Sequence, residues 1–116
     1  MQRVWRTVTG FYHVCARGAG KQLIFEGDED RWEFLELMRE CCRKAGVTVI
    51  AWRLMGKHVH LVLADYEDRM SAAMHRLLLT YARRFNKHTG RTGHLFQNRF
   101  DRRSLDTCLL YTSPSP

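Results

Sequence analysis

Two β-type runs separated by only two residues place the strongest constraint on the fold of this chain. Residues 47–55 read VTVIAWRLM and residues 58–65 read HVHLVLAD, with Gly56 and Lys57 between them. A connection this short joins antiparallel strands, because a parallel pair needs a crossover of a dozen or more residues. The pattern therefore predicts a tight β-hairpin, in which Gly56 supplies the unusual backbone dihedrals of the turn.

Helical periodicity flanks this hairpin on both sides. After a first β-type run, RTVTGFYHVCARG, apolar side chains recur at helical spacing from Phe34 to Ala45, with Asp28 as the expected N-cap and Gly46 as the stop. A second helix is expected over about residues 71–86, and the run HLFQNRFDRRSL over residues 94–105 could be a fourth strand. The order β-α-β-β-α-β predicts an α+β, ferredoxin-like fold, an antiparallel sheet with both helices on one face.

Length and composition fit one globular domain. The chain has 116 residues, of which 45% are hydrophobic and 27% charged. No apolar run approaches the roughly 20 residues of a membrane helix, and no signal-peptide stretch begins the chain, so we expect a cytoplasmic protein without membrane contact. The domain is expected to cover residues 1–107. Residues 108–116, CLLYTSPSP, lack periodicity and are expected to form an unstructured tail, foreign to the rest.

Charge is distributed unevenly along the chain, whose formal net charge is +7. Acidic side chains dominate residues 26–40, and basic side chains dominate residues 76–103, which makes nucleic acid the leading partner class. The candidate phosphate-binding residues of the second helix and the loop after it are Arg76, Arg83, Arg84, Lys87 and Arg91. Gln97 and Arg99 follow among glycines and aromatics, a mixture that suits single strands. A solvated helix face would give the same pattern of basic residues on the helix, and an ordinary turn followed by an edge strand would give the same composition in the loop.

Two histidines interrupt the third predicted strand. Residues two apart on a strand face the same way, so His58 and His60 project together while Val59 and Leu61 face the other side. Two imidazoles on a strand can bind a divalent cation and leave positions open for a phosphodiester. Two ligands do not define a metal site, and a bare H-x-H pair is more often a pair of surface histidines.

No tyrosine is a convincing nucleophile. Tyr81 shares a helical face with Leu77 and Phe85, so we expect it in the core with its hydroxyl at the edge. Tyr12 lies on the first strand, where it faces away from His13, and Tyr66 precedes an acidic loop. The four cysteines, Cys15, Cys41, Cys42 and Cys108, show no metal-type spacing and are expected to be apolar filler.

The order and spacing of four segments resemble the HUH-type tyrosine transposases, in particular the REP-associated branch of the IS200-like superfamily. The segments are YHVCARG, IFEGDEDRWEFLELM, LMGKHVHLVL and MSAAMHRLLLTYARRFNKHTGRTGHLFQNRF. The resemblance implies that His58 and His60 bind Mg²⁺ or Mn²⁺ and that the partner is a single-stranded DNA hairpin. It also implies DNA nicking and strand transfer through a 5′-phosphotyrosine. Whether the chain is a monomer or a homodimer stays open.

The chain departs from that family at two places. Pro-Asn usually precedes the histidine pair, whereas this chain has Gly56 and Lys57, and Lys57 could still approach a phosphate. The family tyrosine lies on a helix after the last strand, with an amide side chain four positions later. Here the residue four positions after Tyr111 is Ser115, between two prolines that forbid such a helix.

We therefore expect the catalytic tyrosine to be missing and the chain to be truncated before the catalytic helix. Three hypotheses follow for the function. The first is a transposase-type enzyme that is impaired by the truncation. The second is a non-catalytic module that binds single-stranded nucleic acid. The third is a metal-dependent phosphoesterase in which water replaces tyrosine as the nucleophile.

Overall fold

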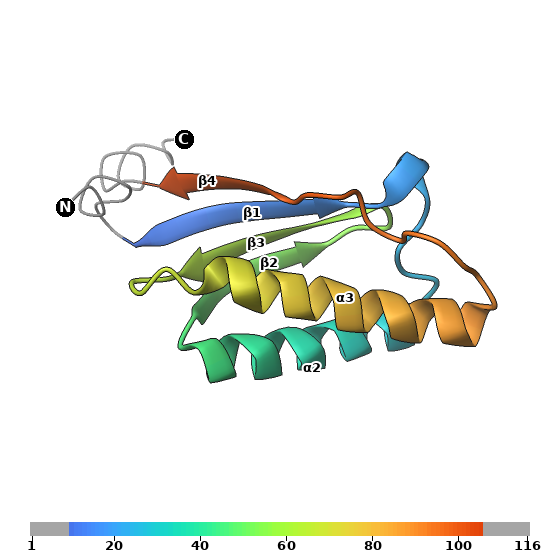
Figure 1. The fold of residues 1–116 in the computed structure, drawn as a ribbon, viewed down its shortest axis with the longest axis horizontal. Coiled ribbons are helices and arrows are strands. Elements are labelled where there is room, and N and C mark those ends of the chain that lie inside the picture. The colour runs from blue at the N-terminus through green and yellow to red at the C-terminus, as the bar shows by residue number, and fades with distance from the viewer. Residues whose placement is uncertain (1–9, 106–116) are drawn as a thin grey trace.

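The computed structural model describes residues 10–105, which form one sheet with two helices on one of its faces (Figure 1). The elements are β1 (Phe11–Arg17), the short 3-10 turn η1 (Ala19–Lys21), α2 (Asp28–Ala45), β2 (Thr48–Leu54), β3 (His58–Ala64), α3 (Met70–Thr89) and β4 (Asp101–Leu105). The strand order is β2-β3-β1-β4, and every neighbouring pair is antiparallel. The predicted ferredoxin-like α+β fold is confirmed.

Several expectations concern residues outside the described range. These are the N-terminal part of the first predicted strand, the tail at residues 108–116, Cys108 and Tyr111. Within residues 10–105, neither helix is long and apolar enough to span a membrane. Cys15, Cys41 and Cys42 are buried free thiols, as expected for small apolar side chains.

The core lies between the sheet and the two helices. Alternate residues of the two central strands, among them Val14 on β1 and Leu61 on β3, are fully buried and face the helices. Phe34 of α2 and Leu77 of α3 pack against them. Both helices lie on one face of the sheet (Figure 1). By strand alternation, the intervening residues, which include both histidines of β3, project from the other face.

Tyr81 is a structural residue of this core. Its ring is fully buried, 5.3 Å from that of Phe34 between centroids, and its hydroxyl donates a 2.6 Å hydrogen bond to the carbonyl oxygen of Ile24. Burial raises the pKa of the phenol, and the nearby carboxylate of Asp30 acts in the same direction. The core position was predicted correctly. The expected placement of the hydroxyl at the edge is wrong, because the segment before α2 closes over it.

The helices begin and end close to the expected residues. The N-cap of α2 is Gly27 rather than Asp28, and Asp30 in the first turn accepts a 2.7 Å hydrogen bond from the backbone N–H of Glu26. Gly46 ends α2 in the left-handed conformation, as predicted. Helix α3 extends beyond the expected residues 71–86 at both ends.

The hairpin between β2 and β3 forms as predicted, but Gly56 is not one of the glycines with a positive φ. Two hydrogen bonds from the segment after β1 stabilise the turn. The N–H of Ile24 donates to the carbonyl oxygen of Gly56 at 2.8 Å, and the N–H of Gly18 donates to that of Lys57 at 2.9 Å. A Cβ atom at position 56 would lie 3.2 Å from the side chain of Leu23. The close approach of Leu23, rather than a positive φ, therefore favours a small residue here.

The fourth strand is shorter than predicted, since β4 covers Asp101–Leu105 and not residues 94–105. Of residues 94–100, only Phe96 takes part in a β-bridge, and none belongs to a strand. Phe96 makes an isolated bridge with Gly18, and the N–H of Gln97 donates to the carbonyl oxygen of Arg17 at 2.9 Å. Residues 94–100 are thus an irregular segment that is tied to the end of β1.

Candidate functional site

The structure brings His58 and His60 together on the uncovered face of the sheet. Both imidazoles are partly exposed, their ring centroids are 4.8 Å apart, and the rings are nearly perpendicular. Val59 and Leu61 are buried on the opposite face, as the strand pattern predicts. The central strand β3 thus presents two imidazole side chains side by side.

A third histidine joins this pair from the neighbouring strand β1. His13 pairs with Val62 in the sheet, which makes it a diagonal neighbour of His60. Its Nε2 atom lies 3.1 Å from Nδ1 of His60, within hydrogen-bonding distance. One of these two nitrogens must carry the proton, so the contact couples the tautomers of the two rings.

Positive side chains surround the histidines. In the sheet register, Arg53 of β2 lies opposite His60, and Arg17 of β1 lies opposite His58. Burial lowers the pKa of His60, and His58, His13, Arg17 and Arg53 act in the same direction. A lowered pKa favours the neutral imidazole, which is the form that binds a metal ion.

Two β4 residues lie at the other side of β1 and complete the charge pattern of this face. Arg103 pairs with His13 in the sheet register. Asp101 pairs with Cys15 and forms an ion pair with the guanidinium of Arg17. The ion pair fixes Arg17 beside the histidines, while Arg53 and Arg103 offer further cationic groups to an anionic ligand.

The side chains at this position supply part of a metal site, but not a complete set of ligands. Within residues 10–105, no three histidine, cysteine, aspartate or glutamate side chains are arranged to hold a metal ion together. His58 and His60 supply two imidazole donors at adjacent positions, and that donor set suits a divalent cation with open coordination positions. A complete site needs at least one more ligand, for example an amide side chain.

The basic residues predicted on α3 lie away from this cluster. Helix α3 packs on the covered face of the sheet, so the exposed side chains of Arg76, Arg83 and Lys87 are on the opposite side of the molecule from the histidines. Arg84 forms a 3.1 Å ion pair with Glu33 of α2. The structure therefore divides the predicted DNA-binding residues between two surfaces.

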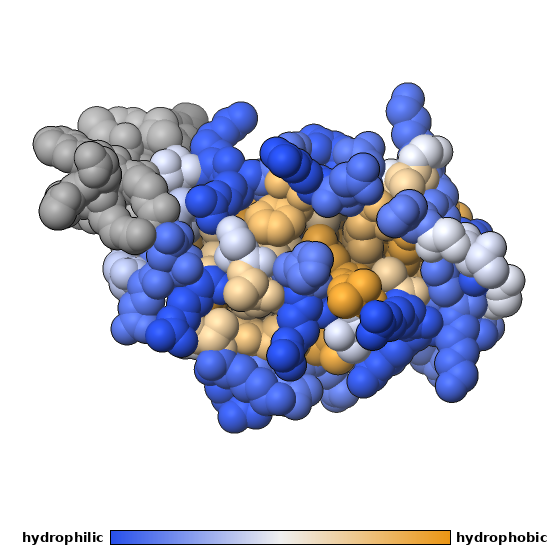
Figure 2. Space-filling view, viewed as in Figure 1, coloured by the Kyte–Doolittle hydropathy of each residue, from blue (hydrophilic) through white to orange (hydrophobic). Residues whose placement is uncertain are grey.

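The other predicted DNA-binding residues lie in loops. Lys57 is exposed in the turn just before His58. Arg91, after α3, donates a 3.1 Å hydrogen bond to Oε1 of Gln22. Gln97 and Arg99 line a hollow of about 490 Å³ between α3 and the segment that leads into β4. In the view of Figure 2, hydrophobic residues are exposed between β4 and the helices, and hydrophilic side chains surround them.

Four residues of the uncovered face were not among the predicted site residues: His13, Arg17, Arg53 and Arg103. For Arg53 the signal was present, because a two-residue turn at Gly56 and Lys57 places Arg53 opposite His60. The positions of His13, Arg17 and Arg103 depend on how β1 pairs with β3 and β4, and the sequence does not specify those registers.

None of the three tyrosines within residues 10–105 lies beside the histidines. Tyr12 and Tyr81 are buried on the helix side of the sheet. Tyr66 is 72% exposed, but it follows the far end of β3, six residues or about 20 Å along an extended strand from His60. This part of the chain therefore holds the histidines and their cationic neighbours without a nearby phenol.

Comparison with known proteins assigns the chain to a family. The family described as "Transposase IS200 like" matches residues 7–108. No curated protein matches the sequence. A solved putative transposase from Deinococcus radiodurans R1 is 18% identical, with a TM-score of 0.63 over 88% of this chain and 83% of that chain.

A second solved structure is a REP-associated tyrosine transposase bound to a REP hairpin. It is 13% identical, with a TM-score of 0.67 over 89% of this chain, which spans 60% of the length of that protein. At these low sequence identities, the two solved structures support the fold alone, whereas the family match supports common ancestry. With residues 7–108 covered by that match, the chain belongs to the IS200-like transposase family.

Proposed function

We propose that this chain binds single-stranded DNA in hairpin form and carries the metal-binding half of a site for DNA nicking and strand transfer. The observation that carries the proposal is the pair His58 and His60, held on one strand with Arg53 and Arg17 opposite them. The hairpin bound by the REP-associated relative supports DNA of this kind as the partner. Cationic side chains beside the histidines suit a phosphodiester backbone.

His58 and His60 are the residues that would hold the metal. A bound Mg²⁺ or Mn²⁺ would polarise the scissile phosphodiester and offset the charge that develops on its oxygens. Imidazole is a poorer ligand for Mg²⁺, which prefers oxygen, so two histidines favour Mn²⁺. We also propose that His13 is a positioning residue. By accepting the Nδ1–H of His60, it would leave Nε2 of His60 free to bind the metal.

The DNA would meet two groups of cationic residues. Lys57, Arg53 and Arg103 lie on or beside the uncovered face and would contact the unpaired strand at the histidines. Arg76, Arg83, Arg84 and Lys87 on α3, with Arg91, Gln97 and Arg99 in the loops after it, would contact the backbone of the paired stem. Phosphate contacts of this kind position a nucleic acid without reading its sequence.

The covalent step needs a tyrosine that residues 10–105 do not supply. In strand cleavage, the phenol loses its proton as its oxygen bonds to phosphorus, the bond from phosphorus to the 3′-oxygen breaks, and the 3′-oxygen takes up a proton. The phosphotyrosine keeps the energy of the broken bond, so rejoining requires no ATP. Tyr12 and Tyr81 are buried and Tyr66 is remote. Tyr111, for which the sequence predicts an unsuitable environment, lies outside the described residues.

A non-catalytic module that binds single-stranded DNA is the second candidate. The observation in its favour is the same absence of a phenol near the histidines within the described part of the chain. This candidate shares the DNA-binding surface of the first and differs only in having no strand chemistry.

A covalent-adduct assay separates the two candidates. The full chain is incubated with a hairpin oligonucleotide and Mn²⁺ and is then run on a denaturing gel. An adduct that depends on His60 and persists in Tyr12→Phe, Tyr66→Phe and Tyr81→Phe variants supports the enzyme, with a nucleophile outside residues 10–105. Hairpin binding with no adduct and no cleavage supports the binding module. Cleavage without an adduct would indicate water as the nucleophile, and no DNA binding would refute both candidates.

A further inference from the structure

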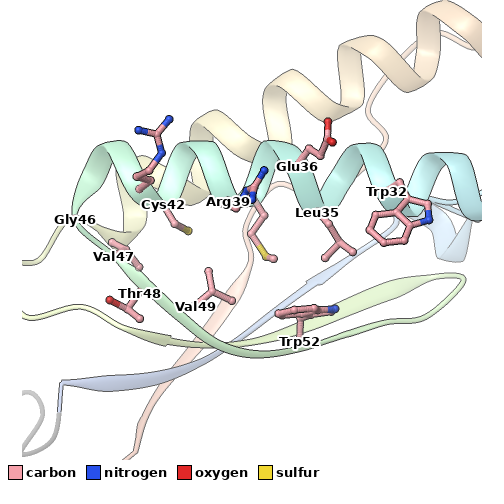
Figure 3. A pocket seen from close by; sticks show the side chains of 12 residues that line it. Trp32, Leu35, Glu36, Arg39, Cys42, Gly46, Val47, Thr48, Val49 and Trp52 are labelled. Carbon is pink, nitrogen blue, oxygen red and sulfur yellow. The ribbon is translucent and has the colours of Figure 1, made fainter.

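A groove of about 720 Å³ runs between α2 and the edge strand β2 (Figure 3). Leu35 and Met38 of α2 and Val49 of β2 contribute apolar side chains to it. Trp32 from α2 and Trp52 from β2 stand near one end, with the ring of Trp52 lying along the strand below α2 (Figure 3). These indoles are 67% and 53% exposed, whereas the aromatic rings of the core are buried. Exposed aromatic surface that lines a groove is typical of a binding site.

Arginines accompany the two indoles. Arg39 and Arg43 line the groove, and a hollow of about 420 Å³ that shares Trp32 and Trp52 with it is lined by Arg31. Two acids lie among these residues, Glu36 and Asp28, and Asp28 faces Arg31 at 3.8 Å. A cationic surface around exposed indoles is complementary to a polyanion with aromatic rings, and less so to an apolar protein surface.

The groove is continuous with the histidine site through β2. Trp52 and Arg53 are consecutive on this strand, so their side chains leave it on opposite faces. Arg53 lies opposite His60 on the uncovered face, while Trp52 lies opposite the core residue Leu61. Because β2 is an edge strand, a nucleic acid strand at His60 can pass over the edge and enter the groove.

We infer that this groove binds unpaired nucleobases of single-stranded DNA, stacked on Trp32 and Trp52, while Arg39 and Arg43 contact the adjoining phosphates. The inference rests on the proposed DNA-binding function and adds a site for bases to it. Base stacking on indole tolerates any base, so the groove contributes affinity for unpaired DNA and no sequence preference.

The test compares two oligonucleotides of the same length, one of dT and one abasic, which share a phosphate backbone. Fluorescence anisotropy gives the affinity of the wild type and of the Trp32→Ala, Trp52→Ala and Trp52→Phe variants. We expect each alanine variant to bind the dT strand roughly tenfold more weakly and the abasic strand as the wild type does. Trp52→Phe should retain most of the affinity, since a phenyl ring still stacks.

Two controls make the result specific to the groove. Leu79→Ala removes an exposed apolar side chain from α3, away from the groove, and should leave both affinities unchanged. In a Trp5→Phe background, the remaining tryptophans are Trp32 and Trp52, so dT should quench the intrinsic fluorescence and the abasic strand should not.

Three results would overturn the inference. Equal losses for the dT and abasic strands would mean that the tryptophans support the fold or the backbone contacts. Unchanged dT binding in both alanine variants would exclude bases from the groove and leave a protein partner as its occupant, while the proposed DNA function stands. A wild-type chain that binds neither strand would refute this inference, and a wild-type chain that also fails to bind the hairpin oligonucleotide would refute the proposed function.

Discussion

The Nδ1 atom of His60 lies 3.1 Å from the Nε2 atom of His13, on the neighbouring strand β1. If His60 carries its proton on Nδ1 and donates it to His13, its Nε2 atom has a free lone pair that can bind a metal ion. His13→Leu should therefore weaken Mn²⁺ binding about 10- to 100-fold. His13→Gln, which keeps an acceptor, should recover much of the loss.

The imidazole ¹⁵N chemical shifts of His60 provide a separate check on this contact. The wild type and His13→Gln should show protonated Nδ1, whereas His13→Leu should show a mixture of tautomers. A His60 ring that is protonated on Nε2 in the metal-free wild type would refute the positioning role. The same holds for Mn²⁺ affinity that does not change in His13→Leu.

The separation of the cationic residues predicts two kinds of DNA contact. Arg83 and Lys87 are exposed on α3, on the far side of the sheet from the histidines. The double variant Arg83→Gln, Lys87→Gln should flatten the salt dependence of hairpin binding by about one to two units of the log–log slope. Binding of an unpaired strand should keep its slope. Equal flattening for both ligands would place the unpaired strand on α3 as well.

Arg53 gives the complementary prediction, because it lies opposite His60 on the uncovered face. Arg53→Gln should lower the slope for the unpaired strand by about 0.7, the value for one phosphate contact on single-stranded DNA. Arg69→Gln serves as the control, since Arg69 belongs to neither group of proposed DNA contacts and pairs with Glu67 at 3.5 Å. A slope that is unchanged by Arg53→Gln would remove this residue from the DNA-binding surface.

Tyr81 should matter for stability and not for chemistry. Tyr81→Phe leaves the buried carbonyl oxygen of Ile24 without its 2.6 Å hydrogen bond, so the free energy of unfolding should fall by about 1–3 kcal/mol. Urea denaturation measures this change. DNA binding at temperatures where the variant is folded should equal that of the wild type. A variant with native stability that has lost strand cleavage would instead make Tyr81 the nucleophile.

The raised pKa of Tyr81 adds a pH dependence with a definite sign. In the unfolded chain the phenol ionises near its ordinary pKa of 10.0, whereas burial holds it protonated to higher pH in the folded protein. Its contribution to stability is therefore complete below about pH 10 and is lost as the pH rises further. The wild type should lose stability above that pH more steeply than Tyr81→Phe, as measured by urea denaturation across the alkaline range.

Asp65 supports the start of α3. Its buried carboxylate accepts hydrogen bonds from the N–H groups of Arg69 and Met70 at 3.0 and 2.8 Å. Asp65→Ala should lower the free energy of unfolding by about 1–2 kcal/mol, because two N–H groups at the helix start lose their acceptor. Asp65→Asn keeps an acceptor and should cost less. Equal losses for the two variants would show that the charge, not the hydrogen bonding, stabilises α3.

Local patterns account for what the sequence predicted well. The two-residue turn determined the β2–β3 hairpin, and through it the placement of Arg53 opposite His60, although that register was not used to name Arg53 as a site residue. Strand alternation put both histidines on one face. Helical spacing put Tyr81 in the core. Each of these depends on residues close together in the sequence.

Non-local contacts explain what the sequence did not predict. His13 and His60 are 47 residues apart, and their contact depends on the register of β1 with β3. The role of Gly56 follows from Leu23, whose side chain approaches from the segment after β1. The irregular segment before β4 is held by hydrogen bonds to the end of β1 and to the residues after it. The periodicity of the sequence does not predict these hydrogen bonds.

The central claim is that His58 and His60 bind a divalent cation that serves DNA strand chemistry. Isothermal titration of Mn²⁺ into the full chain, with and without a hairpin oligonucleotide, tests it most directly. We predict one binding event that is weakened at least about tenfold in His58→Ala and in His60→Ala, and that is unchanged in Tyr66→Phe. Mn²⁺ affinity that is the same in the wild type and both histidine variants would contradict the claim.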